Sequence, residues 1–246
     1  MSGDLTEPHD YRVLLETFPD VTIVGGQAIT AWAIAYLSPD PREGYGSHDM
    51  DVLAKGRVAE IIAAFPDWKS EVPPLWSFDR RLLRLTTYSP DGRLLAIEVL
   101  GKVRGLDAAD LKAVSKIERD GLTYHVLDPI AMLRAKAANV REINQDGPPP
   151  RNDRPHLHLI AQCVPLFLSD MHRQASSNPS EYETFSTIVS RAFRALSDSR
   201  TQKTLLKEGI RPLELIPPEL TNSPIEKVRT TCAHQLPRLK DAIAAY

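Results

Sequence analysis

Short apolar segments separated by glycine and proline turns occupy the first part of the chain. Apolar runs and alternating apolar and polar positions predict strands over residues 21–24, 50–54, 82–88, 94–100, 116–119 and 122–127. Helical spacing of apolar residues predicts helices over residues 11–18, 28–37 and 58–65. The Asp120-Gly121 pair predicts a tight hairpin between the last two strands.

The pattern changes after residue 127, where no further strand is predicted. Asp128 as N-cap and Pro129 at the first helical position predict a helix to about Ile143. Helical spacing continues over residues 152–172, with a kink at Pro165, and over residues 181–196, 201–207 and 225–245. Loops are predicted over residues 38–46, and a flexible link over residues 174–180.

This order of elements predicts an α+β protein. A small mixed β-sheet with helices packed on it would be followed by an all-helical C-terminal region. The glycine–proline break at residues 147–150 sets the expected boundary, giving one domain over residues 1–146 and a helical domain over residues 147–246.

Net charge, cysteine content and hydropathy limit the classes of protein to which this chain can belong. A net charge of −2 over 246 residues gives no overall attraction to nucleic acid or to an anionic membrane. Cys163 and Cys232 stand far apart in apolar helical contexts, as expected for core residues in a reducing compartment. Neither a signal peptide nor a membrane-spanning segment is predicted, so we expect a cytoplasmic protein.

Two carboxylates and two glycines stand out as candidate chemistry. Asp49 and Asp51 point to the same face of the predicted strand, where they repel each other unless a cation lies between them. Gly25 and Gly26 lie between a strand and a helix, where bare backbone N–H groups favour an anion. The two features together predict a site for a metal-bound ligand that carries phosphate.

Two other interpretations compete with this one. A Rossmann dinucleotide site also combines a strand, glycines, a helix and an acid, but only two glycines of its G-x-G-x-x-G fingerprint are present. The simpler structural alternative is a glycine turn beside a solvated acidic strand end.

The glycine pair followed by Asp-x-Asp resembles the opening motif of the DNA polymerase β-like nucleotidyltransferase superfamily. The resemblance implies that Gly25, Gly26, Gln27 and Ser47 bind a nucleoside triphosphate and that Asp49 and Asp51 bind Mg²⁺ or Mn²⁺. The family's third carboxylate corresponds to Glu98, an acid within an apolar strand, in place of the more usual Asp.

The stretch from Leu127 to Arg141 resembles a helix of the AbiEii/AbiGii-type toxin branch of that superfamily. The resemblance implies that Lys136 contacts the nucleotide phosphates and contributes to catalysis, whereas the simpler interpretation of Lys136 is a solvated helix face. Residues 151–158 match the branch's acidic motif loosely, with Asp153 or His156 standing for an acid.

The resemblance implies an enzyme that transfers a nucleotidyl group from a nucleoside triphosphate to an acceptor hydroxyl. In the toxin branch the acceptor is RNA, notably tRNA, and a cognate antitoxin protein is the partner. Two alternatives stay open: an antibiotic-type enzyme with a small-molecule acceptor, and a non-catalytic descendant that binds a nucleotide or a protein.

Overall fold

The computed structural model describes residues 6–37, 47, 49–54, 56–74, 80–147 and 151–246. The predicted loop over residues 38–46 and the prolines at 148–150 lie outside these residues. The chain divides into two compact units, residues 1–132 and 133–246. The predicted domain boundary after residue 146 lies further along the chain, and its role as a limit between folding domains stays a prediction.

A mixed sheet organises the first unit. Its seven described strands are β1 (Thr22–Ile23), β2 (Met50–Leu53), β3 (Lys69–Glu71), β4 (Arg81–Tyr88), β5 (Leu94–Leu100), β6 (Val114–Arg119) and β7 (Leu122–Leu127). They lie in the order β3-β4-β5-β2-β1-β7-β6. The β1–β7 and β2–β5 pairs are parallel, and the other neighbours are antiparallel.

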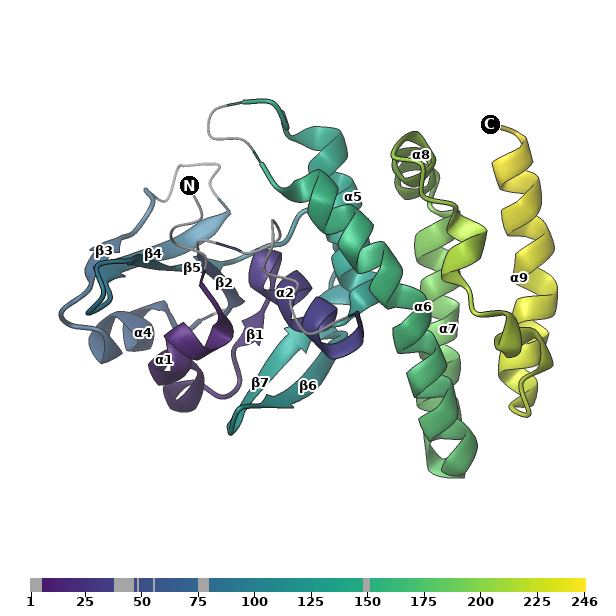
Figure 1. Ribbon diagram of the computed structural model, residues 1–246, viewed down its shortest axis with the longest axis horizontal. Coiled ribbons are helices and arrows are strands. Elements are labelled where there is room, and N and C mark those ends of the chain that lie inside the picture. Colours follow the sequence, from purple (N-terminus) through teal and green to yellow (C-terminus); the bar gives the residue numbers. More distant parts are fainter. Residues whose placement is uncertain (1–5, 38–46, 48, 55, 75–79, 148–150) are drawn as a thin grey trace. The chain divides into compact units, whose positions relative to one another are not determined.

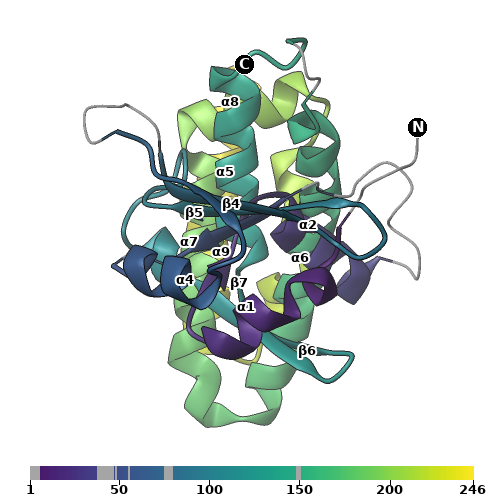
Figure 2. The ribbon, with the colours of Figure 1, turned by 90° about the vertical axis from the view of Figure 1, so that its left-hand side faces the viewer.

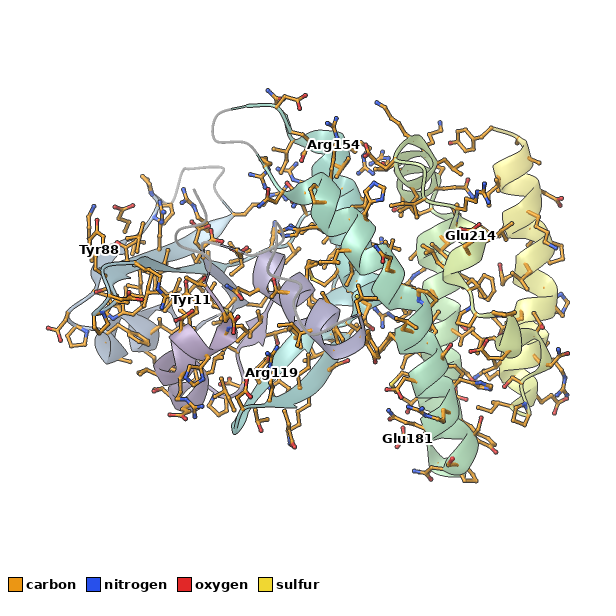
Figure 3. All side chains as sticks on the ribbon, viewed as in Figure 1. Tyr11, Tyr88, Arg119, Arg154, Glu181 and Glu214 are labelled. Carbon is orange, nitrogen blue, oxygen red and sulfur yellow. The ribbon has the colours of Figure 1, made fainter. Side chains whose placement is uncertain are left out.

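Three α-helices described in the first unit pack on this sheet: α1 (Arg12–Thr17), α2 (Gly25–Tyr36) and α4 (Val58–Ala64). Both α1 and α4 lie below β4 and β5 in the two ribbon views (Figures 1 and 2). Tyr11, at the end of the 3₁₀ helix η1 (Pro8–Tyr11), points into the interior, whereas Tyr88 of β4 is 73% exposed (Figure 3). Leu83 and Leu85 of β4 and Ile97 of β5 are fully buried, so these two predicted strands contribute to the core.

The second unit is helical throughout its described residues. It contains most of α5 (Pro129–Glu142), then α6 (Asp153–Ser177), α7 (Tyr182–Ser197), α8 (Ser199–Lys207) and α9 (Glu226–Ala244). Short 3₁₀ turns complete the described elements: η2 (Asp110–Lys112) in the first unit, and η3 (Pro179–Glu181), η4 (Pro212–Leu215) and η5 (Pro218–Asn222) in the second. Helix α7 contacts α6, α8 and α9, so it forms the centre of this unit.

Both cysteines are free and buried in the second unit, as expected for core residues. Burial raises the pKa of Cys163 to about 12 and that of Cys232 to about 11, so both thiols stay protonated at neutral pH. None of the described helices is both long and apolar enough to cross a membrane.

The α+β class and the helical C-terminal region are confirmed, and three local predictions were wrong. Helix α2 begins at Gly25 rather than at residue 28, because Val24 is extended and acts as its N-cap. Helix α6 runs through Ser177, where a link was predicted, because Ala175 is buried and extends the apolar face. Strand β3 was not predicted, since all its residues are exposed and lack an apolar pattern.

Candidate metal centre

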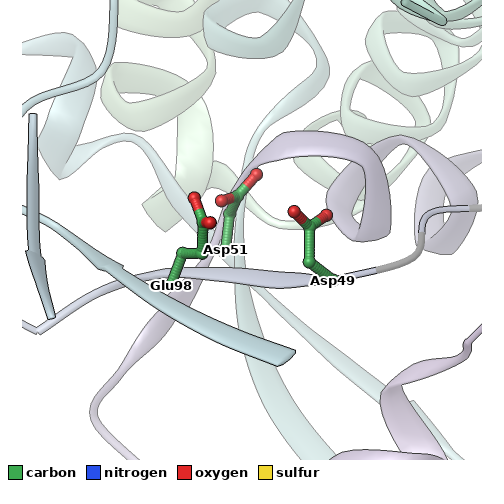
Figure 4. A group of neighbouring side chains, drawn as sticks. All are labelled: Asp49, Asp51 and Glu98. Atoms are coloured by element: carbon green, nitrogen blue, oxygen red, sulfur yellow. The ribbon is translucent and has the colours of Figure 1, made fainter. Parts of the chain in front are cut away.

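Three carboxylates from neighbouring chain segments converge on one face of the sheet (Figure 4). Asp51 of β2 is directly opposite Glu98 of β5 in the parallel register, and Asp49 precedes β2. One oxygen from each carboxylate lies within 4.8 Å of the other two. The structure therefore brings together the three acids that we expected to lie in one site.

The apolar neighbours in the strands hold these acids in place. Ile97 and Val99 are fully buried on either side of Glu98, and Ile97 lies beside residues of α1 and α4. Because side chains alternate along a strand, Glu98 points to the opposite face of the sheet. A one-residue slip of β5 would bury its carboxylate in the core, so the hydrophobic pattern fixes the position of this acid.

Glu98 is half-buried, with 16% of its side chain exposed. Burial raises the pKa of Glu98 and the charge of Asp49 raises it further, although Arg81 and Arg84 act in the opposite direction. Arg81 Nη1 lies 3.2 Å and Arg84 Nε 3.5 Å from Glu98 Oε1. These two cations therefore offset part of the cost of burying the Glu98 carboxylate.

A hydrogen-bonded network fixes Asp49 from the other side. Ser47 Oγ donates to Asp49 Oδ1 at 2.9 Å, and the Ser47 carbonyl accepts from both the backbone N–H and the hydroxyl of Thr6. The fully buried Gln27 side chain donates to the Thr6 carbonyl at 2.7 Å. Ser47 and Gln27 thus position the acid through their side chains, and their contact with a nucleotide stays a prediction.

The start of α2 lies against the acids because Gly25 lacks a side chain. Its φ of 66° is in the left-handed region, and a Cβ at this position would collide with the carboxylate of Asp51. Gly26 follows as a buried residue of the first helical turn. The first N–H groups of a helix have no partner within the helix, so this turn offers anion-binding donors beside Asp51.

Lys136 is buried, so its interpretation as a solvated helix residue is wrong. It lies in the second unit, where its Nζ donates to Asp153 Oδ1 at 2.9 Å. Asp153 also accepts from Asn139 Nδ2 at 3.1 Å and from Arg151 Nε at 2.7 Å. Lys136 therefore joins α5 to α6, and its predicted contact with nucleotide phosphates stays a prediction.

The donor set suits a hard divalent cation. Three carboxylates supply only oxygen ligands, which Mg²⁺, Mn²⁺ and Ca²⁺ prefer, and like charges this close favour a bound cation. Asp49, Asp51 and Glu98 could hold such an ion, and their geometry does not identify the metal.

Sequence reasoning missed Arg81 and Arg84 as neighbours of the acids. A signal for Arg84 was present, because the sequence Pro90-Asp91-Gly92 is typical of a turn, and that turn pairs Tyr88 with Leu94 and hence Arg84 with Glu98. For Arg81 no such signal existed, since its position depends on an irregularity in the register between Arg81 and Leu83.

Comparison with known proteins leaves the family of this chain unassigned. No family model and no curated protein matches the sequence. A solved structure, that of an antigenic nucleotidyltransferase-like protein from Paracoccidioides brasiliensis, is similar over 72% of this chain and 88% of that chain, with 15% identity and a TM-score of 0.40. This likeness is too low to establish a shared family or activity.

Proposed function

We propose that this chain is a metal-dependent nucleotidyltransferase that moves a nucleoside monophosphate from a nucleoside triphosphate to an acceptor hydroxyl. The observation that carries the proposal is the convergence of Asp49, Asp51 and Glu98 beside the glycine start of α2. The same face of the sheet thus offers ligands for a divalent cation and backbone donors for phosphate.

Each part of the site has a role in the proposed reaction. Asp49, Asp51 and Glu98 would hold Mg²⁺ or Mn²⁺, which when bound neutralises charge on the phosphates and polarises their oxygens. The first turn of α2, from Gly25, orients the triphosphate through its N–H groups. We also assign to Glu98 the role of accepting the proton of the acceptor hydroxyl.

The bonds balance as in any nucleotidyl transfer. The acceptor oxygen forms a bond to the α-phosphorus, the bond from that phosphorus to the bridging oxygen breaks, and pyrophosphate leaves. The contact of Lys136 with the leaving pyrophosphate, which the resemblance to the toxin branch implies, would require Lys136 to leave Asp153. Transfer to tRNA and control by an antitoxin protein are part of the same proposal.

The test is transfer of label from each α-³²P nucleoside triphosphate, with Mg²⁺, to total tRNA. We expect Asp51→Ala to lower turnover by about 10³-fold, or about 4 kcal/mol of transition-state stabilisation. Asp67→Ala is the matched control, since Asp67 is an exposed acid elsewhere in the first unit. Near-normal turnover by a folded Asp51→Ala protein would contradict the proposal.

A non-catalytic protein that binds a nucleotide or a partner predicts a different result. Metal and nucleotide would raise the unfolding temperature of the wild-type chain, but no label would reach any acceptor. Repeating the transfer assay with tRNA, with total RNA and with a small-molecule hydroxyl acceptor separates this outcome from a wrongly chosen acceptor, because a direct transfer forms no product without its acceptor.

A further inference from the structure

Asp49 differs from the other two acids of the candidate metal centre because it lies outside the strands of the sheet. Asp51 and Glu98 are paired residues of β2 and β5, so the register of the sheet fixes their backbone positions. Asp49 precedes β2 and takes no part in the strand pairings of the described residues. Because the three carboxylates repel one another without a cation, the acid outside the strands is the one most easily displaced. Its position therefore depends on support from elsewhere in the fold.

That support comes from Thr6, which is distant from Asp49 in the chain. Ser47 Oγ donates to Asp49 Oδ1 at 2.9 Å. The Ser47 carbonyl oxygen accepts two hydrogen bonds from Thr6, one from the backbone N–H at 2.9 Å and one from Oγ1 at 3.0 Å. An antiparallel bridge joins the same two residues. Both lone pairs of this carbonyl are thus occupied by Thr6, which holds the backbone of Ser47 while the Ser47 hydroxyl holds Asp49.

The Thr6 hydroxyl uses its full hydrogen-bonding capacity in this network. It donates to the Ser47 carbonyl, and it accepts from Gln27 Nε2 at 2.8 Å and from the Tyr11 hydroxyl at 3.3 Å. A hydroxyl has one donor and two acceptor lone pairs, so no capacity remains. Thr6, Gln27 and Tyr11 are all buried. Water therefore cannot replace a hydrogen bond that is lost here.

Gln27 connects the network to the start of α2. Its side-chain nitrogen also donates to the Thr6 carbonyl at 2.7 Å, so both of these hydrogen bonds go to Thr6. Gln27 lies two residues after Gly25, whose backbone is packed against the carboxylate of Asp51. The first turn of α2 is therefore tied to the same residue that holds Ser47.

Tyr11 connects the network to β5. Its hydroxyl accepts from the backbone N–H of Ala96 at 3.4 Å. Ala96 lies two residues before Glu98 on the same strand. The hydrogen bonds of Thr6 thus lead to three parts of the candidate metal centre: the segment of Asp49, the start of α2 and the strand that carries Glu98.

We propose that Thr6 is a positioning residue of the metal centre, and that its hydroxyl sets the position of Asp49 through Ser47. This inference rests on the metal centre of the proposed function and extends it to a residue outside the sheet. Residues that orient a metal ligand typically change metal affinity by about 10–100-fold. A Thr6 that served stability alone would change the free energy of unfolding and leave the metal affinity of the folded protein unchanged.

The first experiment measures the affinity of the full chain for Mn²⁺ by isothermal titration, at temperatures where each variant is folded. Thr6→Val keeps the branched shape and removes the hydroxyl, so it should weaken Mn²⁺ binding about tenfold or more. Thr6→Ser should stay within about threefold of the wild type, because it keeps the hydroxyl and loses only the stiffness of the branched side chain.

Thr204→Val is the matched control for loss of a buried threonine hydroxyl. Thr204 lies in α8 of the second unit, and its Oγ1 donates to the carbonyl of Arg200 in the same helix. This variant should bind Mn²⁺ with wild-type affinity. The EPR spectrum of bound Mn²⁺, which reports the arrangement of its ligands, should change in Thr6→Val and be restored in Thr6→Ser.

A double-mutant cycle tests whether Thr6 acts through Ser47. Ser47→Ala should weaken Mn²⁺ binding about as much as Thr6→Val, and Thr6→Val should add less than about a twofold loss in the Ser47→Ala background. Losses that multiply in full would overturn this route. Ser47→Ala leaves the hydrogen bonds of Thr6 in place, so it also provides the test if Thr6→Val does not fold: wild-type affinity of Ser47→Ala would overturn the proposal.

The outcomes separate this inference from the proposed function. Wild-type Mn²⁺ affinity in folded Thr6→Val, or an equal loss in Thr204→Val, would overturn the positioning role. A wild-type chain that binds no Mn²⁺ would overturn both the positioning role and the proposed function. Mn²⁺ binding that depends on Thr6, without transfer of label from any nucleoside triphosphate, would support the positioning role while refuting the proposed nucleotidyl transfer.

Discussion

Gly25 combines a backbone conformation that favours glycine with a position directly against a carboxylate of the candidate metal centre. Its positive φ and its approach to Asp51 both exclude a side chain. We expect Gly25→Ala to displace the Asp51 carboxylate and to weaken Mn²⁺ binding at least tenfold, besides a cost of about 1–2 kcal/mol for the strained backbone. Isothermal titration with Mn²⁺ and urea unfolding measure the two effects separately.

Gly92 provides a matched control for that substitution. Its φ of 84° is also positive, but a Cβ there would meet nothing within 4 Å. Gly92→Ala should therefore lose a similar amount of stability and keep its affinity for Mn²⁺. Equal affinities in the wild-type and Gly25→Ala proteins would show that the close approach to Asp51 does not shape the metal centre.

Residue patterns located Asp49 and Asp51, and the family resemblance led to Glu98. The i and i+2 spacing of Asp49 and Asp51 and the isolated charge of Glu98 within an apolar strand are visible in the sequence. The support for Asp49 was not predictable, because it passes from Ser47 to Thr6 and Gln27, which are far apart in the chain. Such contacts depend on tertiary packing, which has no local sequence pattern.

At the scale of elements, the buried pair between α5 and α6 makes a prediction about pH. Burial alone would raise the pKa of Asp153, but the charge of Lys136 and hydrogen bonds from Lys136 and Arg151 outweigh it and hold this pKa well below its ordinary range. A depressed carboxylate pKa stabilises the fold above the unfolded value of about 3.9. That contribution is lost as the pH falls below this value towards the folded pKa.

We therefore expect Asp153→Asn to lower the free energy of unfolding by about 3 kcal/mol at pH 7, because Lys136 keeps its charge and loses its buried partner. The difference from the wild-type protein should shrink between pH 5 and pH 3, as urea unfolding at several pH values would show. Asp241→Asn, on the exposed surface of α9, serves as the control. A difference that stays constant down to pH 3 would contradict the assigned role of the pair.

Element boundaries show where local patterns fail. Strand β5 and the β6–β7 hairpin follow directly from apolar alternation and the Asp120-Gly121 turn. Strand β3 forms because its backbone pairs with β4, although its side chains are all exposed. Helix α6 extends past its predicted end to Ser177, because Ala175 is buried in the core of the second unit. In both cases tertiary contacts outweigh weak local preferences.

At the scale of the whole molecule, the sequence indicates a change from sheet to helices, and the structure has two compact units that differ in the same way. The change in periodicity after Leu127 made this division predictable. The limit between the compact units falls within α5, after Met132, which no break in composition marks. Because α5 is continuous across this limit, a prediction based on turns and loops does not detect it.

This division makes a final prediction about metal binding. All three acids belong to the first unit, so an ion held there stabilises that unit directly. Mn²⁺ at about 100 times its Kd should add about 2.7 kcal/mol. Hydrogen exchange should slow in β2, β5 and the start of α2, and should stay unchanged in α7 and α9.

The double variant Asp49→Asn with Asp51→Asn is the control. It should be more stable than the metal-free wild type, because a repulsive pair is removed, and it should not respond to Mn²⁺. Equal slowing in both units would mean that they unfold together, and a persistent response of the variant would place the metal elsewhere.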